Sequence, residues 1–107
     1  MISLTADTPI LLATHPADFR KGIDGIAALC RQQLAQNPRN GTVFVFINRT
    51  KTQLRMLTYD GTGFWLMTKR LSQGRFKGWP TDQQKMSMPA AKQLRILLSG
   101  ENPWQKV

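Results

Sequence analysis

The four residues Asp60-Gly61-Thr62-Gly63 stand between two runs of strand-forming residues, Leu54–Tyr59 and Phe64–Lys69. An Asp-Gly pair tolerates the positive backbone angles of a tight turn, so this pattern is a strong hairpin signal. The sequence therefore predicts two adjacent antiparallel strands at its centre.

A third strand is predicted at Thr42–Ile47, where β-branched and aromatic residues follow one another without a break. Such a run indicates a strand with both faces partly buried. The polar turn Asn48–Thr52 leads into the hairpin, so we expect an antiparallel meander of three strands. A shorter apolar run at Ile10–Ala13 lies between two prolines and favours an edge strand or an extended lead-in.

The segment from Asp18 to Gln36 has helical periodicity. Its apolar face comprises Phe19, Ile23, Ile26, Cys30 and Leu34. Gly22 and Gly25 either delay the helix start to about Asp24, as the N-cap, or mark a close approach to a neighbour. Asn37-Pro38 then ends the helix.

A second, shorter helix is predicted at Pro89–Ser99, with Gly100 as its stop. Between the two regions, residues 70–81 are basic and broken by glycine, which favours a loop or a short strand at 75–77. The fold class is α+β: one domain over residues 1–107, with an N-terminal helix packed on a small antiparallel meander and a short C-terminal helix.

Positive charge is concentrated in the middle of the chain. Fifteen Lys and Arg oppose six Asp and Glu, a net charge of +9, and between residues 25 and 81 nine cations face only Asp60. A domain this basic favours a polyanionic partner, although charge can also serve solubility alone. We expect nucleic-acid contacts from Arg55, Lys69, Arg70, Arg75 and Lys77, with Arg49, Lys51, Arg20 and Lys21 around the rim.

Aromatic residues lie among these cations. Trp65 and Trp79 are candidates for stacking on bases or for contact with a protein partner. The alternative is that they are core residues, which we expect for at least one of them.

The residues offer little for catalysis. The six acids are scattered, His15 is the only histidine, and Cys30 is the only cysteine and lies on the apolar helix face. We therefore expect no enzyme activity, no metal site and no cofactor. The lone cysteine, the polar N-terminus and the lack of a long apolar run predict a cytoplasmic protein with no membrane association.

An ordered set of short motifs carries a family resemblance across residues 8 to 100. The set runs Asp18-Phe19-Arg20-Lys21-Gly22-Ile23-Asp24-Gly25-Ile26-Ala27-Ala28-Leu29, Val43-Phe44-Val45-Phe46, Tyr59-Asp60-Gly61-Thr62-Gly63-Phe64-Trp65-Leu66, Lys69-Arg70-Leu71, Gly74-Arg75-Phe76-Lys77, Trp79-Pro80 and Gln93-Leu94 with Leu97-Leu98 and Gly100. Together these motifs resemble the accessory second-open-reading-frame (TnpB-type) protein of the insertion-sequence 66 family of bacterial transposons.

The resemblance implies a non-catalytic accessory protein for DNA transposition, since in such elements a separate, larger protein carries the acidic catalytic residues. Together with the charge, it favours DNA, including transposon ends, as the partner. The alternative is an adaptor that binds the catalytic transposase subunit. Binding of RNA or single-stranded DNA is a further alternative, and the oligomeric state stays open.

Overall fold

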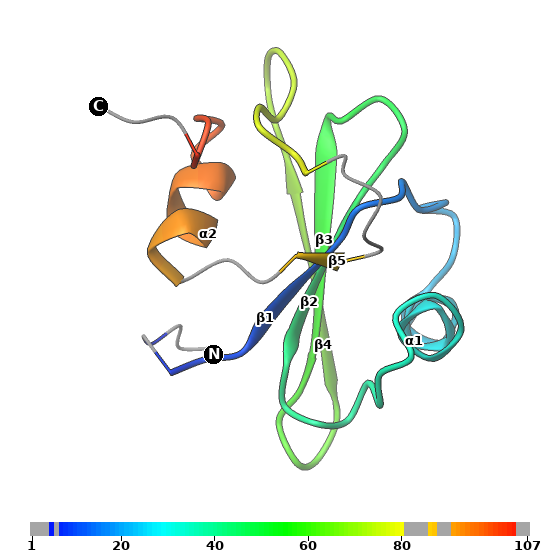
Figure 1. The fold of residues 1–107 in the computed structure, drawn as a ribbon. Coiled ribbons are helices and arrows are strands. Elements are labelled where there is room, and N and C mark those ends of the chain that lie inside the picture. The colour runs from blue at the N-terminus through cyan, green and yellow to red at the C-terminus, as the bar shows by residue number, and fades with distance from the viewer. Residues whose placement is uncertain (1–4, 6, 81–85, 88–90, 105–107) are drawn as a thin grey trace.

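The computed structural model describes residue 5 and residues 7–80, 86–87 and 91–104. The elements follow in the order β1 (Ile10–Ala13), α1 (Ile23–Gln32), β2 (Val43–Ile47), β3 (Gln53–Tyr59), β4 (Phe64–Arg70), β5 (Met86–Ser87) and α2 (Ala91–Leu98). The strands form one mixed sheet in the order β4-β3-β2-β1-β5 (Figure 1). Its antiparallel β2-β3-β4 meander and the two helices confirm the predicted α+β class.

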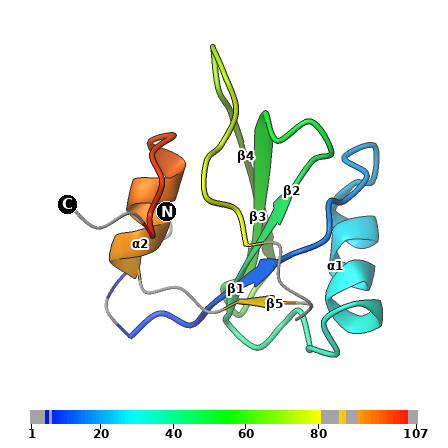
Figure 2. The same ribbon diagram turned by 45° about the horizontal axis from the view of Figure 1, so that its top comes forward.

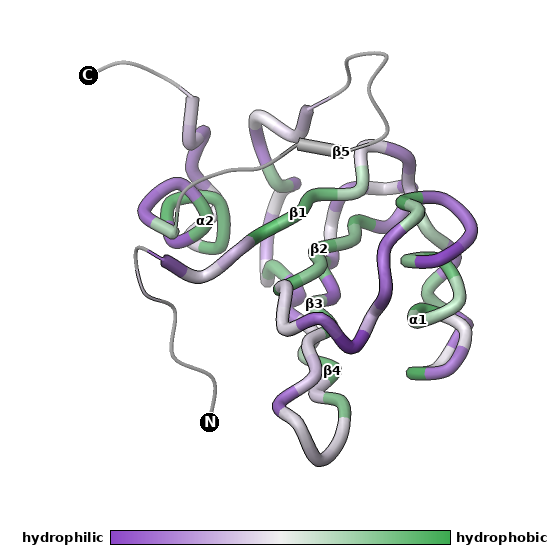
Figure 3. Tube along the Cα trace, turned by 60° about the horizontal axis from the view of Figure 1, so that its bottom comes forward, coloured by the Kyte–Doolittle hydropathy of each residue, from purple (hydrophilic) through white to green (hydrophobic). Residues whose placement is uncertain are grey.

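The sheet lies between the two helices, which cover opposite faces (Figure 2). On the α1 face, Leu11, Phe44, Phe46 and Leu57 join Ile26, Leu29 and Cys30 in one buried cluster. On the α2 face, Leu12, Val43, Val45, Ile47 and Leu54 join Leu94 and Leu97 in another. All residues of β1 and β2 are buried, and both strands are hydrophobic throughout in Figure 3.

Strand β1 lies inside the sheet, so the expectation of an edge position was wrong. It pairs in parallel with β2 on one side and antiparallel with β5 on the other. The flanking prolines do not prevent this, because Pro9 and Pro16 lie outside the paired residues. The carbonyl of Pro9 even accepts a hydrogen bond from the Val43 amide at 2.9 Å.

Helix α1 is shorter than its periodicity predicts. It begins at Ile23 after Gly22, so Asp24 lies in the first turn and is not the N-cap. Gly25 marks a close approach, since a β-carbon there would lie 2.7 Å from Cβ of Lys21. The helix ends early because Ala35 adopts a positive φ of 52° and the Gln36 amide bonds back to the Cys30 carbonyl.

The predicted hairpin is confirmed, and Asp60 organises its turn. One carboxylate oxygen accepts hydrogen bonds from the amides of Thr62 and Gly63, at 2.9 and 3.0 Å, while the other accepts one from the Trp65 indole at 2.8 Å. These donors favour the charged form and hold the pKa of Asp60 well below its usual range. Gly61 supplies the positive φ of 100° that the turn needs.

The C-terminal region also follows its prediction in the part that the structure describes. Helix α2 ends before Gly100, which has a φ of 90°, while the predicted start of the helix at residues 89–90 lies outside the described residues. Residues 71–80 form a loop without a strand. This loop is anchored because Phe76 and Trp79 are buried in the α2-side cluster.

Replacing Leu12 with Ala should lower the free energy of unfolding by about 2–5 kcal/mol, because the side chain is fully buried in the middle of the sheet. Ile23→Ala is the matched control, since Ile23 is 39% exposed and its truncation should cost far less. Urea unfolding of the two variants measures the difference. Equal losses would contradict the central position of β1.

The hairpin should lose stability in acid. Because the pKa of Asp60 is lowered on folding, its stabilising effect is present above the ordinary Asp pKa near 4 and is lost as the pH falls through the folded value. The NMR signal of the Trp65 indole proton should therefore stay constant through about pH 4 and shift only at a pH well below it. Asp60→Asn should abolish this titration, and a titration that persists in the variant would assign it to another group.

Candidate nucleic-acid interface

Three connections of the chain meet at one end of the sheet: the segment 14–22 after β1, the turn 48–52 and the loop 71–80. The Ala17 amide donates to the Ile47 carbonyl at 2.8 Å, which ties the first connection to the end of β2. The amides of Leu71 and Phe76 donate to the carbonyls of Thr52 and Lys51, at 3.1 and 2.8 Å, which ties the loop to the turn. In Figure 1 the turn and the loop lie at the top, opposite the β3–β4 hairpin, and the segment 14–22 lies at the right, above α1.

All nine predicted basic contact residues belong to this end. Lys69 and Arg70, the last residues of β4, lie opposite Leu54 and Gln53 at the start of β3. The others come from the three connections and from Arg55 in β3. We call the following set the basic end: Arg20, Lys21, Arg49, Lys51, Arg55, Lys69, Arg70, Arg75 and Lys77. Its members are exposed except Lys51 and Arg55, which are half-buried.

Asp18 is the acid set among these cations, and it is already paired. Its carboxylate contacts the Arg20 guanidinium at 2.8 Å and also accepts a hydrogen bond from the Arg20 amide at 2.9 Å. The hydrogen bonds from Arg20 hold the pKa of Asp18 well below its usual range. The pair is electrically neutral, so the remaining cations dominate the potential of the basic end.

Asn48 shapes the turn that presents Arg49 and Lys51. Its side-chain oxygen accepts hydrogen bonds from the amides of Thr52 and Gln53, at 2.9 and 3.1 Å. These bonds close the turn tightly enough that Lys51 adopts a positive φ of 60°. The two cations are therefore held on a defined loop at the end of the sheet.

A pocket of about 720 Å³ opens between the first connection and this turn. It is lined by Pro16, Ala17, Asp18, Phe19, Arg20, Asn48, Arg49, Thr50, Gln53 and Arg55. Arg55 lies with its guanidinium 4.8 Å from the centre of the Phe19 ring, and its Nη1 donates to the Lys21 carbonyl at 2.8 Å. The Nε of Arg55 is buried and has no hydrogen-bond partner among the described residues.

Sequence reasoning missed the other members of this pocket. The periodicity predicts Phe19 on the apolar face of the helix, although it lies before the helix begins, and composition marks Asn48 only as part of a polar turn. The run Asp18-Phe19-Arg20-Lys21 was the available signal for a site. It places an aromatic ring directly between an acid and two cations, a pattern that packing in a core does not require.

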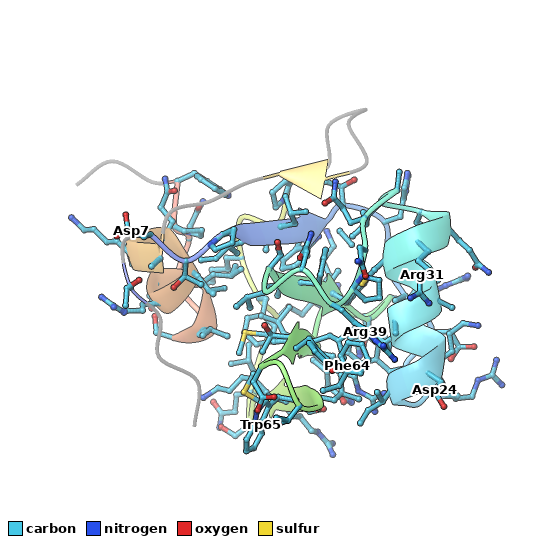
Figure 4. The ribbon with its side chains drawn as sticks, turned by 90° about the horizontal axis from the view of Figure 1, so that it is seen from below. Asp7, Asp24, Arg31, Arg39, Phe64 and Trp65 are labelled. Carbon is cyan, nitrogen blue, oxygen red and sulfur yellow. The ribbon has the colours of Figure 1, made fainter. Side chains whose placement is uncertain are left out.

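Neither Trp65 nor Trp79 offers an exposed ring at the basic end. Trp65 is 43% exposed, but it lies next to the hairpin at the other end of β4. Figure 4 views the molecule from the hairpin side and shows Phe64 on the α1 side of β4 and Trp65 on the other. Trp79 is only 6% exposed and donates to the Ala13 carbonyl at 3.1 Å, so its proposed role as a surface contact was wrong: it is a core residue.

The described part of the chain gives little support for a reactive thiol, a metal site or a membrane-spanning helix. Cys30 is buried, which raises the pKa of its thiol to about 12, so it stays protonated at neutral pH. No group of three or more metal-ligating side chains comes together in residues 5, 7–80, 86–87 and 91–104. Neither α1 nor α2, the helices in those residues, has the length and apolar character needed to cross a membrane.

Two curated proteins of Sinorhizobium fredii (strain NBRC 101917 / NGR234) are similar to this chain. The uncharacterized protein y4jC is 34% identical over 107 residues, which cover 100% of this chain and 90% of the relative. The uncharacterized protein y4hO is 37% identical over 91 residues, which cover 85% of this chain and 78% of the relative. No solved structure matches the chain.

The sequence model of the IS66 Orf2-like proteins, TnpB_IS66, matches residues 8–107, nearly the whole chain. This match supports an accessory role related to transposition and confirms the resemblance seen in the sequence motifs. The chain, with its basic end built from three connections, therefore belongs to the IS66 Orf2-like protein family.

Proposed function

We propose that this protein is a non-catalytic accessory factor that binds DNA during transposition, and that the basic end is its DNA-contacting surface. The observation that carries the proposal is the convergence of nine cations from separate parts of the chain on one end of the sheet. Exposed Lys and Arg side chains neutralise backbone phosphates, which supplies affinity without reading sequence.

The arrangement of the cations supports duplex DNA over a stacked single strand. Lys69, Arg70, Arg75 and Lys77 are exposed, whereas neither Trp65 nor Trp79 presents its ring at this end. Binding of single strands commonly depends on rings that stack on successive bases. Contacts here would go mainly to phosphates, so affinity should depend strongly on salt.

Reversing Lys69 and Arg70 together to Glu should weaken binding to duplex DNA at least tenfold, as an order-of-magnitude expectation at about 0.1 M salt. The slope of log affinity against log salt should fall by roughly 2, because about 0.9 is lost for each phosphate contact on B-DNA. Fluorescence titration with the element's terminal repeat, a scrambled duplex and a single strand measures both quantities.

The matched control reverses Arg31 and Arg39 to Glu, which changes the net charge equally. Figure 4 shows both residues in the view from the hairpin side, and Arg39 lies over the Tyr59 ring at the far end of β3. This control should keep most of the affinity. Equal losses in the two double variants would mean that net charge, and not the basic end, governs binding.

An adaptor role is the second candidate, and exposed apolar groups favour it. Trp65 is 43% exposed, its indole is held by Asp60, and it lies on β4, whose outer edge has no partner strand among the described residues. A large, fixed aromatic ring beside a free strand edge is typical of a protein-binding surface. Its partner would be the catalytic transposase subunit of the same element.

The adaptor role predicts a complex with the transposase that survives nuclease treatment. Trp65→Ala should weaken this complex by roughly tenfold or more, as expected for a buried aromatic contact, and should leave DNA affinity unchanged. Pull-down and titration of the purified proteins measure the effect. A complex that disappears with the nucleic acid would reduce the adaptor role to co-binding on DNA.

A further inference from the structure

Arg55 is a charged residue in an unusual position. It lies in the middle of β3 on the α1 face of the sheet, where its neighbours Leu57 and Phe19 belong to the apolar cluster. Its guanidinium is covered on one side by the Phe19 ring, and its buried Nε has no hydrogen-bond partner among the described residues. A partly dehydrated cation of this kind is costly unless an anion compensates it.

No carboxylate of the described residues supplies that anion. Asp18 is the one acid that lines the pocket, and it is engaged by Arg20. Arg49, from the turn 48–52, also lines the pocket and is exposed. The pocket thus holds two arginines with free donors, a neutral Asp18–Arg20 pair and the amide side chains of Asn48 and Gln53.

We propose that this pocket binds one phosphate group of the nucleic acid, with Arg55 and Arg49 as its donors. The inference rests on the proposed function and gives it an anchor point that the exposed cations of the loop do not provide. Arginine forms paired hydrogen bonds to phosphate oxygens, and two arginines that line one pocket suit a single phosphate group that accepts from both. The volume of about 720 Å³ is large enough to admit a phosphate group.

Asp18 sets the strength of this site. Its carboxylate repels an incoming phosphate and also occupies the Arg20 guanidinium, whose side chain is otherwise 91% exposed. Removing the negative charge should both lower the repulsion and release a third arginine. The pocket therefore predicts opposite effects for two neighbouring substitutions: Arg55→Gln weakens phosphate binding and Asp18→Asn strengthens it.

Inorganic phosphate is the probe, titrated into the ¹⁵N-labelled full chain at constant ionic strength and followed by amide NMR signals. Saturable shifts should be confined to the amides of residues 17–20, 48–50, 53 and 55. Arg55→Gln should raise the phosphate Kd by roughly tenfold or more, as for a lost hydrogen bond to a charged group. Asp18→Asn should lower it by a factor on the order of fivefold.

Two control variants carry the same changes of charge outside the pocket. Arg39→Gln removes a cation at the far end of the sheet, and Asp24→Asn removes an exposed acid in the first turn of α1. Neither should change the phosphate Kd by more than about twofold, because exposed charges at a distance are screened. If Arg55→Gln does not fold, Arg49→Gln replaces it, since Arg49 is exposed on a turn.

The outcomes separate the pocket from the proposed function. Shifts spread evenly over the basic residues, or equal effects of Arg55→Gln and Arg39→Gln, overturn the pocket while DNA binding can still stand. Saturable phosphate binding in a protein that fails to bind any DNA upholds the pocket and overturns DNA as its partner. A weaker site in Asp18→Asn also overturns the inference, because it would mean that the Asp18–Arg20 pair supports phosphate binding and does not oppose it.

Discussion

Strands β1 and β2 have no face that meets water, and this constraint governs the rest of the structure. All their residues are buried, so each face of the central sheet needs its own apolar cover. Helices α1 and α2 provide that cover on opposite sides. Once both faces are occupied, charged side chains have room on the outer sides of the helices, at the ends of the sheet and on its outer strands. The core thus keeps the cations at the periphery, and the three connections bring nine of them to one end.

Local sequence patterns predict the individual turns, strands and helices of this chain. They do not predict features that depend on contacts between segments far apart in the sequence. The Asp-Gly turn, the meander and Gly100 were all predicted, because each depends on residues close in sequence. The interior position of β1 was not, since its parallel partner β2 lies beyond a helix and its second partner is a two-residue strand. The early end of α1 was missed because a positive φ at Ala35 carries no signal in an alanine.

In the candidate site, too, the sequence predicts some features, and others follow only from contacts between distant segments. Charge alone identified the cations, but only the strand register and the loop contacts bring Arg20, Arg49 and Arg70 to one end. The pocket at Arg55 could not be predicted, because an arginine within a strand is normally assigned to the exposed face. Phe19, from before α1, packs over it and turns an ordinary cation into a dehydrated one. The roles of Trp65 and Trp79 depended on burial, which their similar surroundings in sequence did not distinguish.

The contacts that anchor the loop 71–80 also bear on the order in which parts of the molecule fold. The Trp79 indole bonds to Ala13, 66 residues earlier, and the Trp104 indole bonds to the Gly78 carbonyl, 26 residues earlier. Contacts of such long range form late, because the intervening chain must first be brought together. Because Trp104 follows Gly78 by 26 residues, the basic loop gains this last anchor only after that stretch of chain has left the ribosome.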